Sequence, residues 1–154
     1  MYAATTLGHD DAQLALTVME HEVVRRGGAA VLAVADSHGE LIALLRMDGA
    51  KFTSITIAAN KAYTAAREQV ASKTIGLLAR DPSGGFDIAY FGDDRFVGWG
   101  GGVPVVVDRA CVGALAVSGL AEAVDIEIAA FAADALVAWI TAERAAASAS
   151  SAAP

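Results

Sequence analysis

The segment 98–102 reads Gly-Trp-Gly-Gly-Gly and is the most unusual local feature of the sequence. Consecutive glycines allow backbone N–H groups to point into one concavity, so Gly100, Gly101 and Gly102 are candidates to bind a carboxylate or a phosphate. The alternative is a crowded turn that leads into a strand. No Lys-Ser or Lys-Thr pair follows these glycines, and the next residues indicate a strand. The segment is therefore neither a P-loop nor a dinucleotide-binding motif, and no nucleotide is expected.

Three charged residues form a second candidate site, near the end of an expected strand and in the helix that follows. They are Arg46, Asp48 and Lys61. If the fold brings Arg46 and Lys61 together, they can hold an acidic ligand, with Asp48 as their partner or as a general acid or base. The alternative is a salt bridge at the strand end and a helix lysine that faces solvent.

The three histidines, His9, His21 and His38, lack the spacing of metal ligands, so no bare metal ion is expected. His9 lies in a loose N-terminal segment before the first predicted helix, and His38 lies in a predicted turn. His21 lies near Val18 on that helix, where an apolar ligand or a partner can contact it. The alternative for His21 is a surface or interface histidine.

Apolar periodicity and turn residues predict the elements that position these residues. We expect a helix from Asp10 or Asp11 to Arg26, strands at 29–36 and 41–46, helices at 53–70 and 72–81, a loop at 83–102 with short strands near 88–91 and 95–97, strands at 103–107 and 111–118, and a helix from 122 to about 142. Because the strands come as hairpins, this order favours an α/β fold of the α+β type, with an antiparallel sheet flanked by helices. Residues 1–142 are predicted to form a single domain, and residues 143–154 a low-complexity, disordered tail.

The composition indicates a folded protein without a nucleic-acid or membrane partner. The chain has 154 residues, of which 55% are apolar, and a mean hydropathy of +0.47, which excludes disorder of its main part. The formal net charge is −7 and no basic cluster is present, which argues against binding to nucleic acid or to an anionic bilayer. The 36 alanines allow close packing of helices and suit a homo-oligomer. The first residues lack a basic and apolar leader, so a cytoplasmic location is expected.

Short motifs occur along the chain in the same order as in a known family. They are Val34-Ala35-Asp36, Gly39-x-Leu41, Arg46-x-Asp48-Gly49-Ala50, Ser54 through Lys61-Ala62-Tyr63-Thr64-Ala65, Gly101-Gly102-Val103-Pro104, Val112 through Gly119, and Asp125 followed by Ala129. On these motifs, the sequence resembles the GlcG/HbpS-like family, and the resemblance covers roughly residues 12–140.

This resemblance implies a profilin-like sandwich, in which helices cover both faces of a central antiparallel sheet of about five strands. It also implies assembly into homo-dimers or larger rings, and haem as the cofactor. With ferric haem as the ligand, the position of His21 suggests it as the axial ligand of the iron. Arg25, one turn later, is then a partner for a haem propionate.

The sequence leaves three functional hypotheses. The first is a haem (tetrapyrrole)-binding protein that acts as a haem carrier or sensor. The second is an enzyme acting on a carboxylate- or carbonyl-bearing metabolite, with Asp48 as acid or base, Arg46 or Lys61 as the anion clamp, and the 100–102 loop completing the pocket. The third is a structural or regulatory subunit that forms a ring and binds no small ligand.

Overall fold

The computed structural model describes residues 4–151 as four α-helices, one short 3-10 helix and four strands. In chain order they are α1 (His9–Arg25), β1 (Val31–Asp36), β2 (Leu41–Arg46), α2 (Thr53–Glu68), α3 (Ser72–Ala79), η1 (Ile88–Phe91), β3 (Gly102–Val107), β4 (Ala110–Ser118) and α4 (Glu122–Ser151). The short strands expected near 88–91 and 95–97 are therefore wrong, because the first segment forms the 3-10 helix η1 and residues 95–97 lie in a turn and the loop after it.

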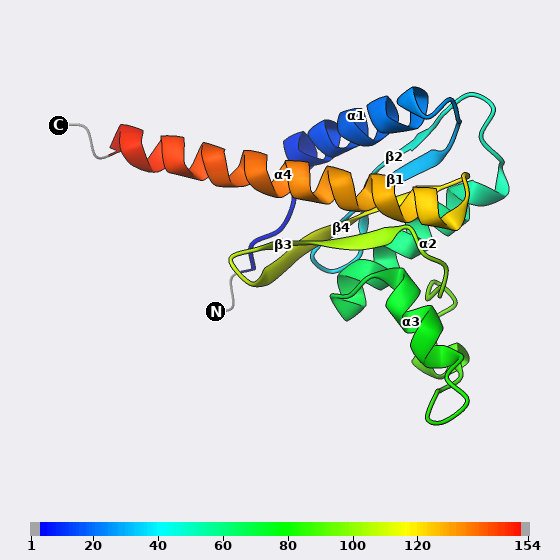
Figure 1. The fold of residues 1–154 in the computed structure, drawn as a ribbon. Coiled ribbons are helices and arrows are strands. Elements are labelled where there is room, and N and C mark those ends of the chain that lie inside the picture. The colour runs from blue at the N-terminus through cyan, green and yellow to red at the C-terminus, as the bar shows by residue number, and fades with distance from the viewer. Residues whose placement is uncertain (1–3, 152–154) are drawn as a thin grey trace.

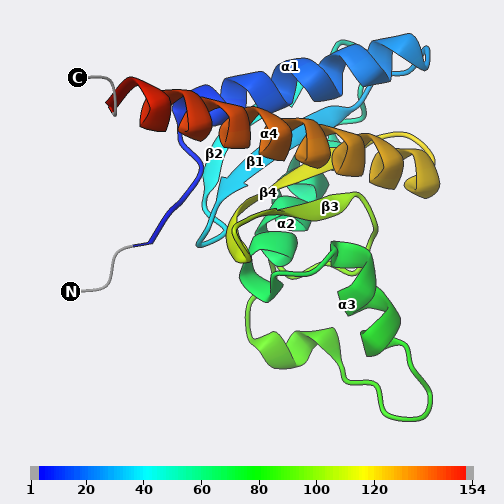
Figure 2. The ribbon, with the colours of Figure 1, turned by 60° about the vertical axis from the view of Figure 1, so that its left-hand side comes forward.

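The strands form one antiparallel sheet in the order β2-β1-β4-β3. Helices α1 and α4 pack side by side on one face, and α2 covers the other face (Figures 1 and 2). The predicted α+β sandwich with helices on both faces is confirmed. Its described sheet has four strands, where about five were expected.

The central strand β1 is buried on both faces of the sheet, which explains its continuous apolar sequence. Because side chains alternate along a strand, Leu32 and Val34 join the core beneath α1 and α4. Val31 and Ala33 instead face α2, where they meet small alanines of that helix. These small side chains let α2 lie close to the sheet, which brings its polar residue Lys61 against the backbone of β4.

Helix α4 is longer than the sequence predicts. Its end was expected near Ala142, but the helix continues to Ser151. The predicted helix end is wrong because residues 143–151 are mostly alanine and serine without glycine or proline, and alanine has the highest helix propensity. Residues 143–150 are exposed, and the last part of α4 projects beyond the sheet (Figure 1). The rest of the predicted tail, 152–154, lies outside the described residues. Within residues 4–151, no helix combines the length and apolarity needed to cross a bilayer.

A polar cluster on α2 fixes the long loop between α3 and β3. The hydroxyl of Tyr63 donates a hydrogen bond of 2.7 Å to Asp93, and the Arg95 guanidinium lies 3.9 Å from the centre of the Tyr63 ring. Hydrogen bonds from the Arg95 guanidinium, and then from Tyr63, hold the pKa of the Asp93 carboxyl well below its usual range. The ionised carboxylate of Asp93 therefore contributes to the stability of the fold.

We expect the Asp93→Asn variant to lose less stability at acidic pH than the wild type does. A carboxyl whose pKa is lowered by folding stabilises the protein above its ordinary pKa of about 4, and this contribution disappears as the pH falls through its lower folded-state pKa. The melting temperature of the wild type should therefore fall more steeply below about pH 4 than that of Asp93→Asn. Asp94→Asn, at the exposed neighbouring position, is the matched control and should follow the wild-type curve.

Candidate functional site

A buried ion pair joins α2 to the start of α4. The Lys61 Nζ atom lies 3.1 Å from Asp125 Oδ2, and both side chains are only 4% exposed. Lys61 also donates a 2.9 Å hydrogen bond to the carbonyl of Val117 in β4. The other oxygen of Asp125 accepts a hydrogen bond from the backbone N–H of Leu120. The pair thus links elements from both sides of the sheet.

Opposing effects act on the pKa of the Asp125 carboxyl. Burial raises its pKa, while the Lys61 ammonium and the backbone N–H groups of Leu120 and Gly119 act in the opposite direction. The net shift of the Asp125 pKa is upward, because desolvation is the largest effect. Buried carboxyls of this kind occur both in acid–base catalysis and in structural ion pairs.

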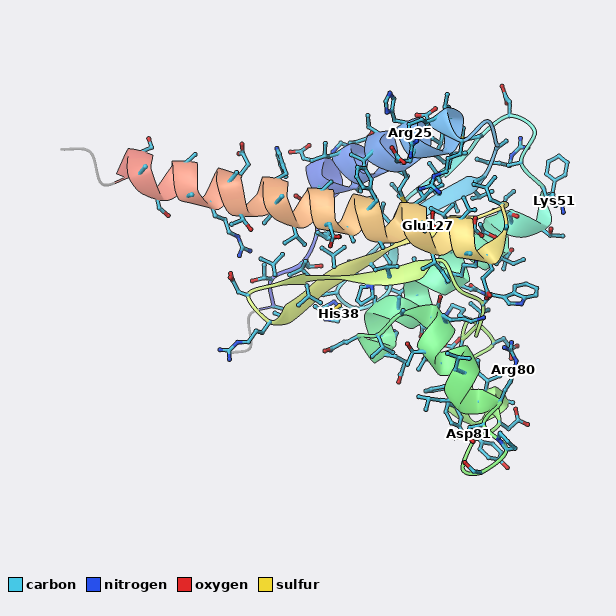
Figure 3. The ribbon with its side chains drawn as sticks, viewed as in Figure 1. Arg25, His38, Lys51, Arg80, Asp81 and Glu127 are labelled. Carbon is cyan, nitrogen blue, oxygen red and sulfur yellow. The ribbon has the colours of Figure 1, made fainter. Side chains whose placement is uncertain are left out.

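The ion pair forms part of the wall of an open hollow of about 480 Å³. The remaining wall comes from the start of α2, from α3, from the loop before β3, and from the end of β4. Most of these residues are polar or charged; they are Lys51, Thr53, Ser54, Ile57, Lys73, Arg80, Trp99, Gly100, Ser118, Gly119, Leu120 and Glu122. Figure 3 shows Lys51 and Arg80 on the same side of the molecule, above and below the first turn of α4.

The glycine loop, residues 98–102, lies against this hollow, but two of its backbone N–H groups donate hydrogen bonds to other residues of the protein. The N–H of Gly100 donates to Glu122 at 2.8 Å, and the N–H of Gly102 donates to the hydroxyl of Ser72 at 3.0 Å. At Gly101, whose φ is +113°, a Cβ atom would lie 2.9 Å from the Nζ atom of Lys61. Glycine is thus required here for close packing, which agrees with the crowded-turn interpretation of the segment.

The structure brings together only some of the residues that the sequence suggested for a polar pocket. Lys61 and Gly100 line the hollow, whereas Arg46 and Asp48 are exposed and do not. The guanidinium of Arg46 lies over the ring of Phe52, 4.8 Å from its centre. Sequence reasoning missed the roles of Asp125 and of Lys73, which pairs with Glu122 at 2.6 Å. Asp125 did occur in the family motif, so a signal for it was present.

His21 lies in a second hollow, of about 550 Å³, between α1 and α4. Its imidazole is exposed, and Val18, Val24 and Phe131 are among the apolar residues of the wall. Arg25 lies one turn further along α1, where its guanidinium makes two hydrogen bonds, of 3.1 and 2.7 Å, with the carboxylate of Glu22. The two hollows thus differ in chemistry. The first is lined mostly by polar and charged residues, with four cations among them. The second is lined by four apolar residues together with His21, Thr17 and the carboxylates of Glu20 and Glu22.

A sequence model of the family described as haem degrading protein HbpS-like matches residues 7–134, well over half of the chain. The protein belongs to the HbpS-like family. The resemblance found in the short sequence motifs is thereby confirmed. Both candidate hollows involve residues within the matched region.

Solved structures of other proteins share the fold of this HbpS-like protein. Protein ORFY of Klebsiella pneumoniae is 26% identical, with a TM-score of 0.81, over 88% of this chain and 94% of that one. A double mutant of Streptomyces reticuli HbpS is 25% identical, with a TM-score of 0.78, over 88% of this chain and 90% of that one. PduOC in its complex with haem is 23% identical, with a TM-score of 0.79, over 85% of this chain and 95% of that one, and shows the fold alone.

One curated relative is similar in sequence over part of its length. It is an uncharacterized 15.0 kDa protein from the dhaT-dhaS intergenic region of Citrobacter freundii, and it is 34% identical over 89 residues. The match covers 58% of the HbpS-like chain and 63% of that relative.

Proposed function

We propose that the protein binds haem in the hollow around His21 and acts as a haem carrier or sensor. The single observation that carries this proposal is an exposed imidazole beside the apolar side chains of Val18, Val24 and Phe131, in a hollow between two helices. The family description as haem degrading supports it, as does the haem complex of PduOC for a protein of the same fold.

The side chains around His21 suit a flat, apolar macrocycle. Val24 and Phe131 are 60% and 53% exposed and line the same hollow, so they form an apolar patch beside His21. A porphyrin placed over them would remove this surface from water. Bound ferric haem supplies an iron atom that accepts an imidazole as axial ligand.

Arg25 is the candidate partner for a propionate group of the same ligand. Its side chain is 60% exposed although it pairs with Glu22. A guanidinium has five N–H donors, so Arg25 can keep its bond to Glu22 and still donate to a propionate. Arg25 would then orient the ligand, while His21 would bind the iron.

Self-association is the second part of the proposal. Phe131 and Trp139 of α4 expose large aromatic surfaces, and α4 extends well beyond the sheet. A second copy of the chain that packs against α4 would cover these side chains and the open side of the haem hollow.

A hemin titration followed by absorbance tests the proposal. We expect a saturable Soret band in the wild type, and an affinity at least about 100-fold weaker in His21→Ala, since loss of even an outer-shell partner of a metal costs 10–100-fold. His38→Ala is the matched control, because His38 is also exposed but lies outside the hollow. A Soret band of equal affinity in all three proteins would refute the role of His21.

A further inference from the structure

The hollow above the Lys61–Asp125 pair has a local charge opposite to that of the whole molecule. Its lining includes four cationic side chains and two carboxylates, although the chain carries a net charge of −7. Lys51 and Arg80, at the rim, have no carboxylate partner among residues 4–151. Cations gathered in a concave surface of an acidic protein attract anions into it.

Lys61 contributes a buried hydrogen-bond donor to the floor of this hollow. An ammonium group has three N–H donors, and within the described part of the chain two acceptors are present, the Val117 carbonyl and Asp125 Oδ2. One N–H of Lys61 therefore remains for a ligand atom. Because the group is buried, a hydrogen bond from it to an anion is stronger than one made in open solvent.

Lys73 adds a second donor that can change its partner. It pairs with Glu122, and this pair is 32% and 40% exposed, so it stabilises the fold only slightly. Glu122 also accepts the N–H of Gly100, which keeps this carboxylate in place when Lys73 turns to a ligand. Lys73 in α3, Arg80 at the end of the same helix and Lys51 before α2 line one hollow, so they can approach the same anion.

The size and the apolar residues of the hollow indicate an organic molecule. Its volume of about 480 Å³ lies within the range of roughly 300–1,000 Å³ that is typical of small-molecule sites. Trp99 is 54% exposed at the rim, and Ile57 and Leu120 also line the wall. These side chains can contact a short carbon skeleton, while the cations hold its acidic groups.

We propose that this hollow is a second ligand site, separate from the haem hollow, for a small organic molecule with two negative charges, carried by carboxylate or phosphate groups. Lys61 holds one acidic group at the floor, and Lys73 and Arg80 hold the other near the rim. The glycine loop shapes the wall and does not supply the main donors.

Calorimetric titration of the full chain with succinate and with inorganic phosphate tests this site, with succinamide as the neutral control. We expect saturable binding of at least one anion below about 10 mM and none of succinamide. Tighter binding of succinate assigns the site to carboxylates, and tighter binding of phosphate assigns it to phosphorylated molecules. In nuclear magnetic resonance spectra, the backbone amides of Gly100 and Gly119 should shift with the same affinity.

Variants that remove one positive charge show where the anion binds and whether this site is separate from the haem site. Arg80→Gln and Lys73→Gln should each weaken anion binding roughly tenfold, as expected for one charge-assisted hydrogen bond. Arg46→Gln is the matched control, because Arg46 is exposed and does not line the hollow. All three variants should keep the Soret titration of the wild type. Absence of binding for both anions at 10 mM, or equal weakening by Arg46→Gln, would overturn the proposal.

Discussion

Replacement of Asp125 by Ala is expected to lower the free energy of unfolding by about 3–5 kcal/mol, one of the largest effects of any single change in this protein. The reason is that Lys61 would keep a buried ammonium group without its carboxylate. The backbone N–H of Leu120 would also lose its acceptor. Urea denaturation followed by circular dichroism measures this loss directly.

Two further variants make the Asp125 result interpretable. Asp134→Ala changes an exposed aspartate on the same helix and should alter stability by less than about 0.5 kcal/mol. The double variant with Lys61→Met and Asp125→Leu removes both charges, so it should recover much of the lost stability. An Asp125→Ala protein as stable as the wild type would contradict the buried ion pair.

Replacement of Gly101 by Ala is the second change with a large expected effect. At its φ of +113°, an added Cβ would lie 2.6 Å from the Val117 carbonyl and 2.9 Å from the Nζ of Lys61. Backbone strain and overpacking together should cost about 2–5 kcal/mol in the free energy of unfolding.

Gly84→Ala is the matched control for the glycine loop. A Cβ atom on Gly84 meets nothing within 4 Å, so this variant should unfold at the same urea concentration as the wild type or slightly higher. Equal stability of Gly101→Ala and Gly84→Ala would show that the loop does not pack tightly against the ion pair.

The sequence was sufficient to predict the helices, the hairpins and the antiparallel sheet, because these depend on local patterns. The apolar run of β1 and the turn residues after it mark a buried strand and its hairpin partner. The end of α4 differs from the prediction because the helix propensity of alanine continues the helix through a segment of low sequence complexity.

Which residues line the polar hollow depends on the order of the strands in the sheet, and local sequence patterns do not specify this order. Arg46 pairs with Val31, and Val31 pairs with Ser118, so Arg46 lies at the same end of the sheet as the hollow but two strands away from Ser118. At the usual strand spacing this is about 10 Å. Asp125 reaches Lys61 only through the packing of α4 against the sheet, across 64 positions of sequence.

The identity of the axial ligand to bound ferric haem tests the central claim most directly. Pulsed electron paramagnetic resonance on protein with isotope-labelled histidine detects the coupling between an imidazole nitrogen and the iron. We expect this coupling in the wild type and in His38→Ala, and its loss in His21→Ala. The same histidine coupling in His21→Ala as in the wild type would contradict the proposed haem site.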